Sequence, residues 1–90
     1  MASVPRTCTV TILRPAVHAI ERLDLDARTR IRQAIRTLVT VPRPVGCVKL
    51  SDSADGYRIR VGDYRILYEM RDRELVIIVV KVGHRRDVYR

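Results

Sequence analysis

The sequence predicts an α+β domain in which two helices from its N-terminal half pack on a mostly antiparallel four-stranded sheet. Apolar residues alternate with polar ones near the start of the chain and again over residues 57–68, as in half-buried strands. Between these segments they recur every three or four residues, which is the spacing of an amphipathic helix. With 90 residues, we expect a single domain over residues 1–90, in the order strand, helix, helix, strand, strand, strand.

The first strand and both helices are expected within residues 7–38. Residues 7–12 alternate cleanly, and the inward face of that strand would carry Cys8, Val10 and Ile12. Pro15 suits the first turn of a helix, and Asp26 can cap the next one. The inward residues of the two helices would be Val17, Ile20 and Leu23, followed by Ile31, Ala34, Ile35 and Leu38. Residues 42–56 contain two prolines and are expected to be mostly loop.

Residues 57–68 form the most informative segment, because their turn sets the register of a hairpin. Gly62-Asp63 is typical of a two-residue turn with glycine at its first central position. That turn places Arg60 opposite Arg65 and Tyr57 opposite Tyr68. Side chains alternate between the two faces of a strand. One face, expected to belong to the core, would therefore carry Tyr57, Ile59, Val61, Tyr64, Ile66 and Tyr68.

The other face of this hairpin would carry Arg58, Arg60 and Arg65. Like charges directly opposite each other destabilise a sheet, so this placement indicates that the arginines bind an anion. Phosphate is the natural candidate because the guanidinium fork matches its oxygens. A face that is merely solvated usually mixes the two signs of charge, whereas Glu69 is the only acid expected on this one.

The last strand and the segment after it extend this site. Residues 75–82 are almost continuously apolar, which predicts a central strand buried on both faces. Residues 83–90 follow directly, so their side chains should emerge beside the hairpin arginines. Among them, His84 changes its charge most easily near neutral pH. Tyr89 can stack on a nucleic-acid base or donate a hydrogen bond.

Composition favours a polyanionic partner. The formal net charge is +8, and the basic residues lie among periodic apolar ones, so we expect a folded basic domain that binds RNA, DNA, a ribosome or an acidic protein. Arg28, Arg32 and Arg36 share one face of the second helix, which is either a phosphate-binding ridge or a solvated surface.

Other classes of function find no support in the sequence. Cys8 and Cys47 lack the spacing of metal ligands, and the chain has no phosphate-binding glycine loop or nucleophile elbow. We therefore expect neither cofactor nor metal. We also find no signal peptide and no apolar run long enough to span a membrane, so we expect a cytoplasmic protein without a membrane partner.

Two motifs resemble the RelE/ParE superfamily of toxins from type II toxin–antitoxin systems. They are Tyr-Arg-Ile-Arg-Val-Gly-Asp-Tyr-Arg-Ile-Leu-Tyr over residues 57–68 and Val-Gly-His-Arg-Arg-Asp-Val-Tyr-Arg over residues 82–90. They are most similar to the RelE branch, and the element order is similar over nearly the whole chain. The resemblance implies a RelE-like fold and a toxin held inactive by an antitoxin. It also implies cleavage of messenger RNA in the ribosomal decoding site, by attack of the 2′-hydroxyl on the adjacent phosphate without metal or cofactor.

The resemblance assigns catalytic roles to five positions. The two basic residues of the first hairpin strand are Arg58 and Arg60, and the arginine that stabilises the transition state is Arg65. A further arginine after the Val-Gly pair is Arg85, and the tyrosine near the end of the motif is Tyr89.

The sequence departs from some relatives, which have lysine where Arg58 and Arg60 stand. Lysine can lose a proton when buried but arginine stays charged, so these two residues should clamp phosphate rather than act as bases. Tyr89, His84 and Glu69 remain alternatives for the proton-transferring group. Further contacts to RNA are expected from Lys49, Arg86 and Arg90.

The partners implied by this interpretation are a cognate acidic antitoxin, the ribosome and messenger RNA, with operator DNA reached only through the antitoxin. One alternative is a ParE-like inhibitor of DNA gyrase, which shares the fold and a similar His-Arg-Arg-Asp segment but performs no nuclease chemistry. Another is a module that binds only its antitoxin and acts as a co-repressor. Tyr89 and the clustered hairpin arginines favour the RelE interpretation.

Overall fold

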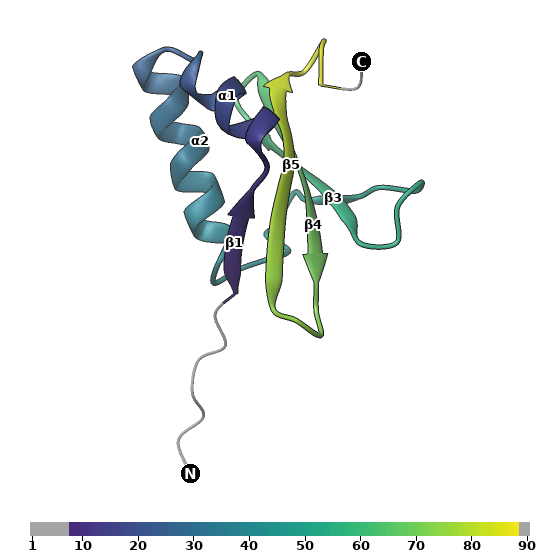
Figure 1. Cartoon of the computed structure of the whole chain (residues 1–90). Coiled ribbons are helices and arrows are strands. Elements are labelled where there is room, and N and C mark those ends of the chain that lie inside the picture. Colours follow the sequence, from purple (N-terminus) through teal and green to yellow (C-terminus); the bar gives the residue numbers. More distant parts are fainter. Residues whose placement is uncertain (1–7, 89–90) are drawn as a thin grey trace.

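The computed structural model describes residues 8–88. The elements are β1 (Thr9–Ile12), α1 (Arg14–Glu21), α2 (Leu25–Leu38), β2 (Val48–Lys49), β3 (Gly56–Val61), β4 (Tyr64–Arg71) and β5 (Val76–His84). The strands form one sheet in the order β1-β5-β4-β3-β2. The β1–β5 pair is parallel and the other pairs are antiparallel. The helices pack on one side of this sheet (Figure 1), which confirms the predicted α+β class with five strands rather than four.

The helices begin close to where the sequence predicts them. Pro15 lies in the first turn of α1. The cap of α2 differs from the prediction: Asp24, not Asp26, accepts a hydrogen bond from the Ala27 N–H at 2.9 Å. Because α2 begins at Leu25, Asp26 lies in its first turn and instead forms an ion pair with Arg30 at 3.4 Å.

The core lies between the helices and one face of the sheet. Five side chains there are completely shielded from solvent, namely Ile31, Leu38, Ile66, Ile77 and Val79. Tyr68 is also buried, and its hydroxyl donates a 2.7 Å hydrogen bond to the Pro42 carbonyl. Burial raises the pKa of this phenol above its usual range. The hydrogen bond from this hydroxyl to Pro42 anchors the loop that follows α2.

The hairpin register agrees with the prediction at every pair. Val61 pairs with Tyr64, Arg60 with Arg65 and Ile59 with Ile66. Gly62 has φ +59°, the left-handed conformation that its place in the turn requires. The alternation of the two strands therefore directs their arginines away from the helices.

Strand β2 is absent from the predicted set of elements. Residues 42–56 were expected to be mostly loop, yet Val48 pairs with Arg58 and Lys49 with Tyr57. A strand of two residues gives no alternation that could be recognised in the sequence.

The prediction for the last strand was correct in its position inside the sheet but wrong in its burial. Strand β5 lies between β1 and β4, as Figure 1 shows, and only one of its faces packs against the helices. A bulge interrupts its pairing with β4: Leu67 pairs with Lys81 and Tyr68 with Val79, so Val80 has no direct partner there. Val79 and Val82 are buried, whereas Val80 and Lys81 between them are only half-buried.

No helix within residues 8–88 is long and apolar enough to cross a membrane.

Candidate functional site

The face of the sheet turned away from the helices, here called the open face, carries the candidate site. Strand pairing arranges its central residues in two rows. The upper row consists of Arg60, Arg65 and Gly83, which are paired across β3, β4 and β5. The lower row runs across β2, β3, β4 and β5 and consists of Val48, Arg58, Leu67 and Lys81. The open face thus gathers basic side chains from three strands.

The hairpin arginines line a common hollow. The hollow has a volume of about 200 Å³ and is lined by Gly46, Val48, Arg58, Arg60 and Arg65. Arg58 and Arg65 are half-buried and Arg60 is exposed. The predicted clustering of the three arginines is therefore present in the structure.

Backbone oxygens, rather than carboxylates, accept hydrogen bonds from two of these arginines. Nε of Arg60 donates to the Gly62 carbonyl at 3.2 Å, and Nη1 of Arg65 lies 3.5 Å from the Tyr64 carbonyl. Within residues 8–88, neither Arg60 nor Arg65 forms an ion pair with an acidic side chain. Two guanidinium groups on directly paired residues repel each other, and an anion bound between them would relieve that repulsion.

The segment after β5 folds back against the upper row. The Arg85 N–H donates to the Asp63 carbonyl in the hairpin turn at 2.8 Å, and the Val88 N–H donates to the His84 carbonyl at 3.0 Å. A Cβ atom at Gly83 would point toward the open face, 3.6 Å from the Cα of Val88. Val88 is 1% exposed. Val88 therefore packs over Gly83, beside Arg65, while Tyr89 and Arg90 lie outside the described residues.

Two of the predicted proton-transferring residues lie away from the arginines. His84 is paired with Tyr64, so it lies on the helix side of the sheet. The two rings meet edge-on, with their centroids 5.9 Å apart. Glu69 is on the open face, but it is four residues along β4 from Arg65, about 13 Å away. Its carboxylate is 3.2 Å from the Arg71 guanidinium.

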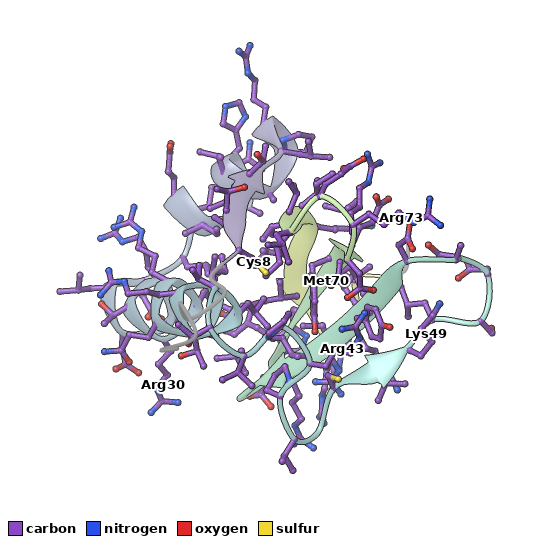
Figure 2. The ribbon with its side chains drawn as sticks, turned by 90° about the horizontal axis from the view of Figure 1, so that it is seen from below. Cys8, Arg30, Arg43, Lys49, Met70 and Arg73 are labelled. Carbon is purple, nitrogen blue, oxygen red and sulfur yellow. The ribbon has the colours of Figure 1, made fainter. Side chains whose placement is uncertain are left out.

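The predicted RNA contacts Lys49 and Arg86 are also separate from the hollow. Pairing with Tyr57 turns Lys49 to the helix side, where its ammonium lies 5.4 Å from the centre of the Tyr57 ring. That ammonium donates hydrogen bonds to the carbonyls of Leu50 and Ser53. Figure 2 shows Lys49 and Arg43 at the β2 edge of the sheet, and Arg43 also contacts the Tyr57 ring. Arg86 is exposed in the turn after β5.

Lys81 is a basic residue of the open face to which the sequence analysis assigned no role. It lies within a run of apolar residues, which predicts a strand buried on both faces. The lysine itself was the available signal, because a charged side chain inside an apolar strand must face a polar surface or a partner.

Within residues 8–88, no group of three or more His, Cys, Asp or Glu side chains could hold a metal ion.

Comparison with known proteins agrees with this architecture. The family model described as the ParE toxin of type II toxin–antitoxin systems matches residues 10–89. The chain belongs to the ParE toxin family. It is therefore a toxin of the RelE/ParE superfamily, as its motifs indicated.

Individual relatives carry RelE-type names. Toxin RelG from Mycobacterium tuberculosis is 35% identical over 49 residues, which cover 54% of this chain and 56% of that protein. The chain thus matches little more than half the length of this curated relative. The RelE–RelB complex of Pyrococcus horikoshii has 29% identity and a TM-score of 0.81, covering 91% of this chain and 99% of the matched chain. For the RelB–RelE complex of Methanococcus jannaschii the identity is 25% and the TM-score 0.69, covering 87% and 93%.

Proposed function

We propose that this toxin cleaves messenger RNA on the ribosome, in the cytoplasm, and so inhibits translation. The observation that supports this best is the pairing of Arg60 with Arg65 on the open face, beside Arg58 and the fold-back of residues 85–88. The guanidinium groups of Arg60 and Arg65 repel each other in the empty protein, and a phosphodiester bound between them offsets that repulsion.

The proposed reaction is a transfer of the phosphoryl ester within the RNA. The 2′-hydroxyl oxygen attacks the adjacent phosphorus and loses its proton, the bond to the 5′-oxygen breaks, and the departing 5′-oxygen takes up a proton. The products are a 2′,3′-cyclic phosphate and a 5′-hydroxyl. Arg65 and Arg85 stabilise the charge that builds on the phosphoryl oxygens, while Arg58 and Arg60 clamp the backbone. Guanidinium groups supply this stabilisation while remaining charged throughout.

The group that moves the proton is proposed to be Tyr89. His84 lies on the other face of the sheet, and Glu69 lies about 13 Å along β4 from Arg65 and is paired with Arg71. Val88, the residue before Tyr89 in the chain, packs against Gly83 beside Arg65. Arg86 and Arg90 are proposed to add contacts to RNA, and Lys49 would do so only from the opposite face.

A ParE-like inhibition of DNA gyrase is the second candidate, favoured by the description of the matching family model. RNA ends and DNA breaks are to be mapped after the chain is induced in cells. We expect early cuts within translated codons, with DNA intact. Intact messages accompanied by broken DNA and an SOS response would assign the protein to gyrase inhibition instead.

We also propose an acidic antitoxin as the partner of this toxin, reaching operator DNA only through that antitoxin. Two related solved structures are complexes of RelE with RelB. A ligand that binds only the folded state raises its stability, so co-expression with the neighbouring reading frame should give a stoichiometric complex that melts at a higher temperature. Failure of the two purified proteins to associate at micromolar concentration would contradict this assignment. Binding without any RNA cleavage or gyrase inhibition would leave the co-repressor alternative.

A further inference from the structure

We propose that the open face binds two consecutive phosphates of a single RNA strand, and that Lys81 together with Arg58 holds the second one. This inference rests on the proposed function, because it states how many phosphates of the same substrate the face contacts. In this division, the upper row of Arg60 and Arg65 takes the phosphate that is cleaved.

The spacing of the two rows suits an extended nucleic-acid strand. Arg65 and Leu67 are two residues apart on β4, which corresponds to about 6.7 Å along the strand. Neighbouring phosphates of a single strand are separated by a similar distance. A backbone running along β4 would therefore present one phosphate to each row.

The lower row can surround its phosphate from two sides. Arg58 and Lys81 are the direct partners of Leu67 on its two neighbouring strands. Two inter-strand spacings separate their Cα atoms by roughly 9.6 Å, which long basic side chains can bridge above Leu67. Leu67 is half-buried and Val48, at the end of the row, is 43% exposed. These apolar groups offer a surface to the ribose between the phosphates.

The bulge in β5 explains why Lys81 faces this side. Ile77 and Val79 point into the core, so uninterrupted alternation would direct residue 81 into the core as well. The extra residue Val80 shifts the alternation, so that Lys81 joins the open face and Val82 returns to the core. The irregular pairing at Val80 thus places the positive charge of Lys81 on a face that already carries Arg58 and Arg65. This arrangement is favourable when an anion lies over the row.

The test uses two short RNAs that cannot be cleaved because each ribose carries a 2′-O-methyl group. One is a dinucleotide with a single phosphate, and the other is a trinucleotide with two. Both are titrated into the whole toxin, and binding is followed by NMR at several salt concentrations. We expect the wild-type protein to bind the trinucleotide about tenfold more tightly, with a salt slope steeper by about 0.7 for the additional phosphate.

Substitution of the lysine should affect only the second phosphate. Lys81→Gln should weaken trinucleotide binding about five- to tenfold and remove the additional salt slope, while dinucleotide binding changes less than twofold. Lys81→Arg should retain both. The matched control is Arg73→Gln, which removes one positive charge from the exposed turn between β4 and β5 (Figure 2). It should leave the difference between the two RNAs unchanged.

The possible failures can be distinguished. Equal weakening of both RNAs by Lys81→Gln, or no weakening of either, would overturn the second phosphate site. If Arg65→Ala still abolished binding in that case, the proposed function would stand without this site. Failure of the folded wild-type toxin to bind either RNA would overturn the RNA-binding proposal and the second site with it.

Discussion

The two faces of the sheet differ in what their side chains do for the folded protein. On the helix side, Ile66 and its neighbours are shielded from water and hold the layers together. On the open face, Arg65 and Leu67 occupy the flanking positions of the same strand, and Arg65 lines the hollow together with Arg58 and Arg60. Because alternate residues of β4 serve different purposes, stability and ligand binding can be changed separately by substitutions one position apart.

The largest effect on stability should come from the helix side. Ile66→Ala removes a side chain that is 0% exposed at the centre of the core. Such a change costs about 2–5 kcal/mol of unfolding free energy, through lost burial and the cavity it leaves. Urea denaturation measures this, and Leu67→Ala on the open face is the matched control, with an expected loss of about 1 kcal/mol. Equal losses at the two positions would show that the faces do not differ as described.

The corresponding change on the open face should affect activity and spare the fold. Arg65→Ala removes one donor to the developing charge, which should lower single-turnover cleavage by about 10²-fold or more. Its unfolding free energy should stay the same or rise by up to ~1 kcal/mol, because the repulsion with Arg60 is relieved. Arg65→Lys should restore activity only partly, since ammonium lacks the planar fork.

Cleavage and toxicity assays, together with the melting temperature, decide this second prediction. Full toxicity of a stably folded Arg65→Ala protein would exclude the open face from the mechanism. A large fall in melting temperature would instead show that Arg65 is a structural residue.

The smallest effect should depend on pH and involve Tyr68. Burial raises the pKa of this phenol in the folded protein above the value of about 10 in an unfolded chain. Its contribution is fully present below pH 10 and is lost as the pH rises from 10 through the folded-state pKa, because the unfolded chain ionises first. Tyr68→Phe should lower the unfolding free energy by about 1 kcal/mol at pH 7, because the hydrogen bond to Pro42 is lost. As the pH rises above 10, the unfolding free energy of the Phe variant should fall less than that of the wild-type protein. Parallel stability curves for the two proteins between pH 8 and 11 would contradict this account.

The parts of the fold that sequence predicted well are those governed by short-range rules. The turn at Gly62-Asp63 set the hairpin register, and that register alone brought Arg58, Arg60 and Arg65 together. The apolar spacing of α2 likewise identified Ile31, Ile35 and Leu38 as buried.

The parts that sequence missed depend on contacts between distant segments. The bulge at Val80 arises from the pairing of β5 with β4, so simple alternation could not place Lys81. His84 was grouped with the arginines because it follows the last strand, but its pairing with Tyr64 turns it to the helix side. Asp26 was predicted as the cap, but the helix begins at Leu25, which makes Asp24 the cap residue.

The position of β1 beside β5 has a consequence for when the protein becomes a toxin. The strand made first, Thr9–Ile12, has its partner in Val76–His84, near the far end of the sequence. While the chain is being synthesised, β1 and the helices that follow it must wait for β5 to leave the ribosome before the sheet can form. Both rows of the open face also include β5, through Lys81 and Gly83. A nascent chain therefore lacks the complete open face until synthesis has passed the last strand.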